Sequence, residues 1–574
     1  MENMKLQEQK LLSYSVLFPD KHDTIENLLA DVPSKSAVEF VATLISWKNH
    51  QLVDQLETEI WGPWIMQCRC DVKNPIGNYM DGANLKEYVL IDIYALLSLL
   101  DKLLCQYNNE ARELSKDDKS NLMLSYLICC DERLDFEKKL PSIDMPADKF
   151  VELFLPIELK YNNVVTIRDY RLQLILCYSL LLEFPKANNK FKRYVDAFCK
   201  GNNLTNPKEY LDNLFMFNFD LLGAKQGTCV IDIDNSCWKS INFIERFSLD
   251  VYNYKHSEDF HKFRECPVLK IGPRKYMFLF INLFLDKAFT GLLFDMAESL
   301  ENLGVLKPQK AYADLKGFIG EEFSEKYMFY NIMQRCFGQR YVRHTGAELK
   351  SLIGDGEPDY YMRRGNRVFV FECKDTLLAN KYKLSGDYRE IVKGIEEKYI
   401  SNKNAKPKGI VQLANVIENK LSMILSDVDK DAPQGIKYVF PILVYFDDSF
   451  DSEGVNWHLN KRFKEIISQS AFSPNYIVKD LIMINIAQLM RLENFFADDK
   501  LRLATLINSY IDYKNQKDLN QVFPFNKFLF QEARKKGYEL KKTRWFDEVY
   551  QNLVALDEIT REATSTTINS VELF

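Results

Sequence analysis

The chain has 574 residues, of which 47% are apolar and 27% charged, and its 75 basic and 81 acidic residues give a net charge of −6. With only 22 glycines and 18 prolines, this composition excludes collagen-like, low-complexity and intrinsically disordered classes. The acidic balance argues against a generally basic nucleic-acid coat protein, although a local basic site is compatible with it.

The sequence predicts a cytoplasmic protein without membrane contact. Its first ten residues, MENMKLQEQK, lack the apolar stretch of a signal peptide. The most apolar segment, residues 277–285, is followed at once by Asp286 and Lys287, whereas a membrane span needs roughly 18 apolar residues. The 12 cysteines form no C-x-x-C pair, so we expect reduced thiols and no structural zinc.

Residues 1–305 are expected to form a mainly helical region. Apolar residues recur at three- and four-residue steps over 37–47, 87–105, 170–184, 210–222 and 276–300. Segments 228–233 and 268–280 are expected to be extended. The phosphate-binding pattern G-x-x-x-x-G-K-[ST] is absent from the chain, so we expect no nucleotide cofactor. We interpret this half as a recognition, regulatory or assembly region.

A Gly- and Pro-containing segment at 304–309 marks the expected start of a second domain, residues 310–500. Its predicted elements, in chain order, are a helix over 315–337, a strand over 339–345, a hairpin of 359–364 and 367–374, a helix over 408–427, a strand over 437–446 and a strand–helix unit over 481–496. Charged helices predict a C-terminal extension, 501–574, that ends in a frayed tail.

The predicted hairpin carries the side chains with the clearest chemistry. On a strand, side chains alternate between faces, so Glu372 and Lys374 lie on the same face of an otherwise apolar strand. The hairpin brings Asp359 beside Glu372. Two adjacent carboxylates repel each other, and a divalent cation relieves that repulsion while it polarises a phosphate oxygen. Because the ligands are oxygens, Mg²⁺ or Mn²⁺ is expected.

The motif Pro358-Asp359 followed by Glu372-Cys373-Lys374 resembles the PD-(D/E)xK nuclease superfamily. The resemblance covers about residues 310–450, or up to 500, and implies an α/β restriction-endonuclease-like core, αβββαβ, with a mixed sheet flanked by helices. It implies that Asp359, Glu372 and the Cys373 carbonyl hold the metal. It also implies that Lys374 orients or activates the attacking water.

Two further residues follow from the same resemblance. Many members carry a glutamate after a glycine on the first core helix, and Gly320-Glu321 fits that pattern, with Glu325 as the alternative one turn later. Several branches carry a glutamine on the second core helix, and Gln412 fits. Glu321 and Gln412 are therefore the expected supporting residues of the site.

The resemblance implies a metal-dependent endonuclease, with DNA preferred to RNA as substrate. Residues 335–408 contain 16 basic against 10 acidic residues, and the segment 381–408 is rich in lysine, as expected for contacts with a phosphate backbone. The helical half would mediate homodimerisation or partner binding, and such fusions resemble antiviral defence effectors against phage or plasmid DNA. The alternatives are an RNA-cleaving nuclease and a non-catalytic nucleic-acid-binding or assembly subunit with a dormant fold.

Overall fold

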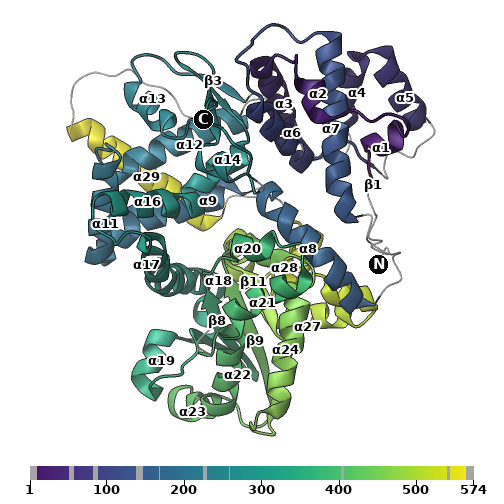
Figure 1. Cartoon of the computed structure of the whole chain (residues 1–574). Coiled ribbons are helices and arrows are strands. Elements are labelled where there is room, and N and C mark those ends of the chain that lie inside the picture. The colour runs from purple at the N-terminus through teal and green to yellow at the C-terminus, as the bar shows by residue number, and fades with distance from the viewer. Residues whose placement is uncertain are drawn as a thin grey trace. The chain divides into compact units, whose positions relative to one another are not determined.

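The computed structural model describes residues 10–50, 57–81, 88–137, 146–166, 168–223, 229–257, 259–401, 406–538 and 543–563. They form two compact units, each built from separate stretches of the chain (Figure 1). Unit 1 comprises Met1–Arg168, Glu209–Asp295 and Leu378–Ile395; unit 2 comprises Asp169–Lys208, Met296–Leu377 and Glu396–Phe574. Within the described residues, no helix is long and apolar enough to cross a membrane.

This division differs from the three consecutive domains expected from the sequence. Those were residues 1–305, 310–500 and 501–574. Residues 169–208 belong to the α/β unit, and 378–395, inside the predicted nuclease domain, belong to the mainly helical unit. Such exchanges depend on contacts between distant segments, which local periodicity does not encode. The predicted frayed tail, 564–574, lies outside the described residues.

Unit 1 is mainly helical, as predicted for the N-terminal half. Its elements are β1 Lys10–Leu11, α1 Tyr14–Leu17, α2 Ile25–Leu29, α3 Ser34–His50, α4 Glu57–Met66, α5 Cys70–Asp81, β2 Tyr88–Val89, α6 Ile93–Cys105, α7 Lys116–Glu137, α8 Ala147–Val165, β3 Val230–Asp232, α13 Trp238–Glu245, α14 His261–Glu265, β4 Val268–Lys270, β5 Lys275–Phe278, α15 Ile281–Leu285, η4 Asp286–Ala288 and α20 Asn380–Lys383. Helices α12 Pro207–Gly223, α16 Thr290–Asn302 and α21 Tyr388–Tyr399 run across unit boundaries.

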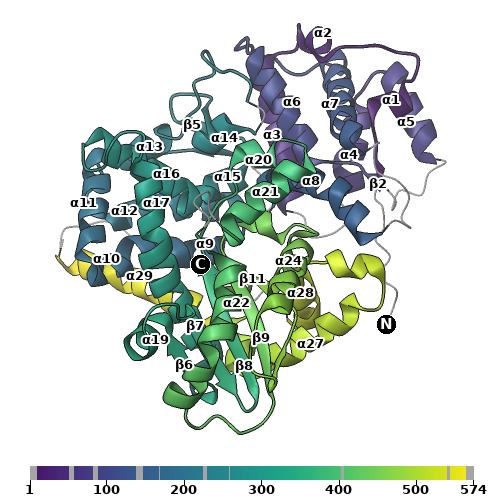
Figure 2. The same ribbon diagram turned by 60° about the horizontal axis from the view of Figure 1, so that its bottom comes forward.

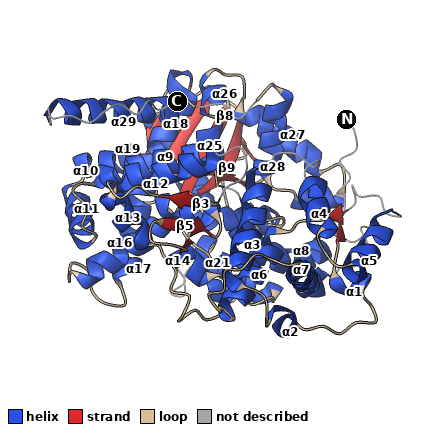
Figure 3. Cartoon of the chain, turned by 90° about the horizontal axis from the view of Figure 1, so that it is seen from above, coloured by secondary structure: helices blue, strands red, loops and turns tan. Residues whose placement is uncertain are grey.

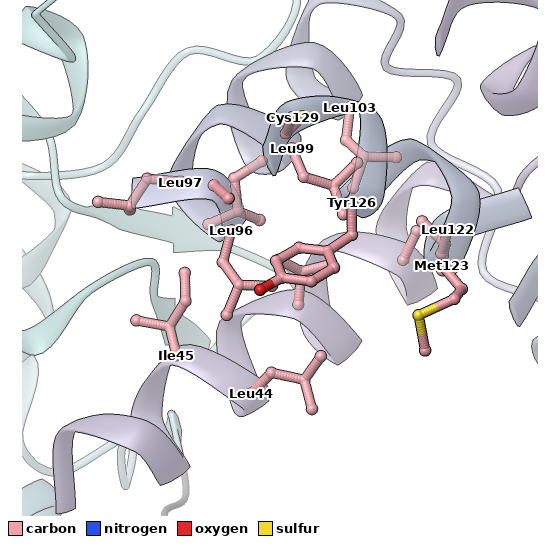
Figure 4. Packing of buried hydrophobic residues seen from close by; sticks show 14 of the residues in the cluster. Leu44, Ile45, Leu96, Leu97, Leu99, Leu103, Leu122, Met123, Tyr126 and Cys129 are labelled. Atoms are coloured by element: carbon pink, nitrogen blue, oxygen red, sulfur yellow. The ribbon is translucent and has the colours of Figure 1, made fainter. Parts of the chain in front are cut away.

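The core of unit 1 lies between helices α3, α6 and α7. Leu44, Leu96 and Leu103 are buried there around the ring of Tyr126 (Figure 4). The Tyr126 hydroxyl donates a hydrogen bond to the Leu90 carbonyl (3.0 Å) and accepts one from the N–H of Asp92 (2.8 Å). These bonds satisfy the one polar atom of that ring inside an apolar core.

Two sequence expectations for unit 1 need correction at their boundaries. The helix expected over 87–105 begins at Ile93, because the Asp92 side chain accepts the N–H of Ala95 at 2.8 Å and caps it. The helix expected over 276–300 is interrupted, since β5 occupies Lys275–Phe278 and pairs antiparallel with β3 and β4. The expected extended segments at 228–233 and 268–280 are confirmed by these strands.

Unit 2 contains a mixed sheet flanked by helices. Its elements are α9 Tyr170–Tyr178, η3 Ser179–Glu183, α10 Phe184–Ala187, α11 Asn189–Gly201, α17 Ala311–Phe318, η5 Ile319–Phe329, α18 Tyr330–Phe337, η6 Gly338–Arg340, β6 Val342–Thr345, α19 Gly346–Ile353, β7 Tyr360–Arg364, β8 Arg367–Lys374, α22 Gly409–Asn419, α23 Leu421–Met423, η7 Ile424–Val428, β9 Lys437–Tyr445, η8 Asp448–Asp451, α24 Val455–Gln469, β10 Tyr476–Val478, β11 Ile482–Asn485, α25 Ile486–Arg491, α26 Glu493–Ala497, α27 Leu503–Lys514, η9 Asp518–Val522, α28 Phe525–Lys535 and α29 Arg544–Ala563.

The sheet has the order β10-β9-β8-β7-β6. Strand β10 pairs with the first residues of β9, and β11 pairs with its last residues. Figure 2 labels β6 to β9 and β11. Strands β6, β7 and β8 are antiparallel, whereas β8, β10 and β11 each run parallel to β9. Strands β8 and β9 are buried among helices (Figure 3), which explains their nearly continuous apolar sequences. Because they are parallel, the residues that follow Lys374 and Tyr445 emerge at the same edge of the sheet.

Helices α17, η5 and α18 follow one another without a break, and the segment η5 is wound with π-helical hydrogen bonds. The ring of Phe329 packs against Tyr360 of β7 (5.7 Å between centroids) and Phe371 of β8 (6.1 Å). These contacts hold the preceding turns of the helix next to the end of β8. π-helical segments inside helices often occur at functional sites.

Candidate active site

Three of the sequence-predicted residues meet at the hairpin of β7 and β8. The Lys374 ammonium lies 2.5 Å from Glu372 Oε1 and 3.7 Å from Asp359 Oδ2. The predicted alternation of β8 is therefore confirmed, since Glu372 and Lys374 share a face. The Lys374 side chain is 23% exposed and that of Asp359 16%, so a solute can reach this end of the site.

The position of Asp359 is fixed by backbone contacts. Its Oδ2 accepts the N–H of Cys373 at 2.7 Å, and its carbonyl accepts the N–H of Gly346 at 2.8 Å. A Cβ at Gly346 would lie 2.9 Å from the Pro358 carbonyl oxygen, so only glycine allows this close approach. The backbone thus holds one carboxylate in place before any ligand binds.

Glu372 is the most unusual group of the site. Its side chain is 1% exposed, and among the described residues its only polar partner is the Lys374 ammonium at Oε1, which leaves Oε2 without a hydrogen bond. The ion pair with Lys374 compensates part of its charge. Burying a carboxylate oxygen without a hydrogen bond is costly, so an additional cation at Oε2 would stabilise this arrangement.

Burial and mutual repulsion shift the carboxyl groups toward their protonated forms. Burial raises the pKa of Glu372, and the neighbouring Asp359 raises it further. Burial also raises the pKa of Asp359. Burial alone would lower the pKa of Lys374, but Glu372 and Asp359 raise it well above its usual value. Lys374 is therefore a cation at neutral pH, able to donate hydrogen bonds rather than accept a proton.

The structure places Glu325, and not Glu321, beside these carboxylates. Glu321 is exposed and forms an ion pair with Lys326 at 2.9 Å. Glu325 is half-buried, and burial together with the charge of Asp359 raises its pKa to about 8. The preference for Glu321 is corrected accordingly, because η5 turns Glu321 toward solvent.

Gln412 supports its own helix. Its side-chain oxygen accepts the N–H of Gly409 at 2.8 Å, which satisfies a free donor at the first turn of α22. In the described part of the chain, no hydrogen bond connects Gln412 to Asp359, Glu372 or Lys374. The structure therefore shows a local structural role for Gln412, and its supporting role at the site stays a prediction.

The sequence did not predict one residue that supports the site, Asp375. Asp375, directly after Lys374, is buried, forms an ion pair with Lys316 at 2.5 Å and accepts a hydrogen bond from the Ser324 hydroxyl at 2.6 Å. These contacts tie the end of β8 to the first core helix, at the residue just before Glu325. Because Ser324 lies in the π-helical segment η5, the sequence spacing gives no reliable signal for this contact.

Two carboxylates and a carbonyl fit a magnesium site better than a zinc site. Within the described chain, no group of three His, Cys, Asp or Glu side chains is arranged to enclose a metal ion. Mg²⁺ is commonly held by one or two carboxylates, with waters and substrate phosphates as the other ligands. Burial raises the pKa of the Cys373 thiol well above its usual value, so this residue would contribute its carbonyl and not a thiolate.

The raised pKa of Glu325 predicts a pH dependence of stability in the metal-free protein. The carboxyl ionises near pH 4.5 when unfolded but near 8 when folded, so the folded state loses stability as pH rises between these values. Glu325→Gln removes this loss. We expect wild type to lose stability relative to Glu325→Gln from pH 5 to pH 8, as measured by urea unfolding in EDTA. A constant difference between the two proteins would contradict this placement of Glu325.

Comparison with known proteins identifies no family for this chain. No family model matches the chain, and neither a curated protein nor a solved structure matches it. The function is therefore inferred from the side chains and the sheet that carries them.

Proposed function

We propose that unit 2 is a divalent-metal-dependent nuclease that hydrolyses phosphodiester bonds in DNA. The observation that carries this proposal is the buried Glu372 carboxylate, which adjoins Asp359 and has the Lys374 ammonium as its only polar partner among the described residues. Clusters of buried groups with strongly shifted pKa values are typical of catalytic sites. A purely structural ion pair would be expected to have its remaining oxygens satisfied.

The side chains have complementary roles in this proposal. Asp359 and Glu372 each place an oxygen near the Lys374 ammonium, and the Cys373 N–H keeps Asp359 oriented. Lys374, a cation that is partly exposed, would donate a hydrogen bond to the attacking water and stabilise negative charge that develops on the phosphate. Glu325 adds a third carboxyl whose protonation responds to the charge of its neighbours.

The site has the oxygen donors for Mg²⁺ or Mn²⁺, which Asp359, Glu372 and the Cys373 carbonyl would hold. When bound, such an ion polarises a phosphate oxygen as a Lewis acid. The order of helix, strands, helix and strand in unit 2 also supports membership of the PD-(D/E)xK superfamily, with a restriction-endonuclease-like fold. We infer DNA rather than RNA as the substrate from the same resemblance.

The test is cleavage of end-labelled duplex DNA and structured RNA of equal length by the full chain. The proposal predicts cleavage of DNA with Mg²⁺ or Mn²⁺, none with EDTA, and weaker cleavage of RNA. Preferential cleavage of RNA would change the substrate assignment. Absence of cleavage of both polymers with both metals would contradict the nuclease function.

A further inference from the structure

Two lysines lie near the edge of the sheet where β8 and β9 end. Lys398 is in the last turn of α21, in the part that belongs to unit 2, and Lys408 immediately precedes α22. The N–H of Lys408 donates to the Ile400 carbonyl at 2.8 Å, and Ser401 pairs with Pro407. This backbone pairing holds the two lysine-bearing segments together.

A close backbone approach fixes their position further. Gly409 has a positive φ of 40°, and a Cβ on it would lie 2.8 Å from the Tyr399 carbonyl oxygen. The Tyr399 ring is buried against Phe450, which follows β9 (4.8 Å between centroids). Burial raises the pKa of Tyr399, and the nearby carboxylates of Asp447 and Asp375, which come after β9 and β8, raise it further. Lys398 is therefore anchored at the edge that also carries Lys374.

The charge of this lysine pair is poorly compensated. In the described part of the chain, neither Lys398 nor Lys408 forms an ion pair with a carboxylate. Both side chains are half-buried. Burial lowers the pKa of Lys398 and the charge of Lys408 lowers it further, while the carboxylates of Glu397 and Asp447 offset only part of this effect. A half-buried cation beside another cation is unfavourable, and an anion between them would remove this cost.

We propose that Lys398 and Lys408 bind a backbone phosphate that flanks the scissile phosphodiester of a polynucleotide. This inference rests on the proposed nuclease function and extends it, because a second phosphate site selects a polymer over a mononucleotide ester. Lysine suits this task as a point charge that binds phosphate without reading bases.

The lysine pair also refines the basic segment predicted from the sequence. Within 381–408, Lys381 and Lys393 belong to unit 1, and Lys393 is paired with Glu390 at 3.5 Å. Lys398 and Lys408 belong to the same unit as Asp359 and Glu372. Lys406 belongs to this unit as well but is exposed, so Lys398 and Lys408 are the half-buried lysines of this part of the segment.

The experiment measures binding of the full chain to fluorescein-labelled 20-mers of DNA and RNA in EDTA, over a range of KCl concentrations. The slope of log affinity against log salt counts phosphate contacts. The variant Lys398→Ala/Lys408→Ala is compared with Lys430→Ala/Lys461→Ala, which removes two exposed charges from the same unit. We expect the first variant to lower the slope by about 1 to 2 and the second to leave it unchanged.

Equal slopes for wild type and Lys398→Ala/Lys408→Ala would overturn the inference, as would equal losses in both double variants. A lower slope with DNA and RNA alike supports a site for the shared phosphate backbone, and a lower slope with one polymer identifies the source of that phosphate. Because EDTA prevents metal-dependent cleavage, this result is independent of catalysis. A protein that fails to cleave but shows the expected slopes would refute the nuclease function and leave the phosphate site in place.

Discussion

Glu372→Gln is expected to lower metal-dependent cleavage by about 10³-fold. Glutamine has the shape of glutamate but not its charge, so it would weaken the hold on a divalent ion at the point where two carboxylates meet. Several kcal/mol of charge stabilisation depend on such an ion, and each 1.36 kcal/mol changes a rate about tenfold. Steady-state cleavage of duplex DNA with saturating Mg²⁺ measures the effect.

The matched controls are two glutamates of the first core helix, Glu321 and Glu325, whereas Glu372 lies on β8. Glu321→Gln removes an exposed carboxylate that pairs with Lys326, and cleavage should stay within about threefold of wild type, as expected for an exposed ion pair. Glu325→Gln should cause a loss of cleavage between these extremes, because the charge of Asp359 acts on the Glu325 carboxyl and raises its pKa. A larger loss in Glu321→Gln than in Glu372→Gln would contradict the site described here.

Asp429→Ala is expected to destabilise unit 2 by about 3–5 kcal/mol, the usual cost of leaving one partner of a buried ion pair uncompensated. The Asp429 carboxylate accepts hydrogen bonds from the Arg363 guanidinium, one of them 2.8 Å long, and from the Tyr361 hydroxyl at 2.7 Å. Both partners are on β7, and all three side chains are buried. Removing the carboxylate leaves a buried guanidinium charge without its counter-ion.

The control is Asp427→Ala, two residues earlier, where the side chain is exposed and should contribute less than about 0.5 kcal/mol. Urea unfolding gives the change in stability, and hydrogen exchange of the β7 amides assigns it to unit 2. Equal effects of the two substitutions would show that the Arg363–Asp429 pair does not stabilise the sheet.

Much of the α/β unit could be predicted from the sequence because its signals are local. The alternation along β8 gave the shared face of Glu372 and Lys374, and the ion pair between them confirms it. The apolar segment that became β9 is nearly continuous, as expected for a parallel strand buried on both faces. Helix α19 was missed, although Thr345 and Glu348 form a reciprocal cap that the pattern T-x-x-E signals.

The errors have physical causes that act beyond local patterns. The winding of η5 is π-helical, so the face that each residue presents shifts relative to an ordinary helix, and Glu325 takes the place expected for Glu321. The assignment of 169–208 and 378–395 to their units depends on packing between segments far apart in the sequence.

Nicking of supercoiled plasmid by wild type and by Asp359→Asn, each with Mg²⁺ and with EDTA, tests the metal-dependent site most directly. Asp359 is fixed by the Cys373 and Gly346 N–H groups, so the substitution removes one charge with little change in shape. We predict that wild type nicks the plasmid with Mg²⁺ and that the variant does not. Neither protein should nick it in EDTA. Equal nicking by wild type and Asp359→Asn with Mg²⁺ would contradict the assignment of this site.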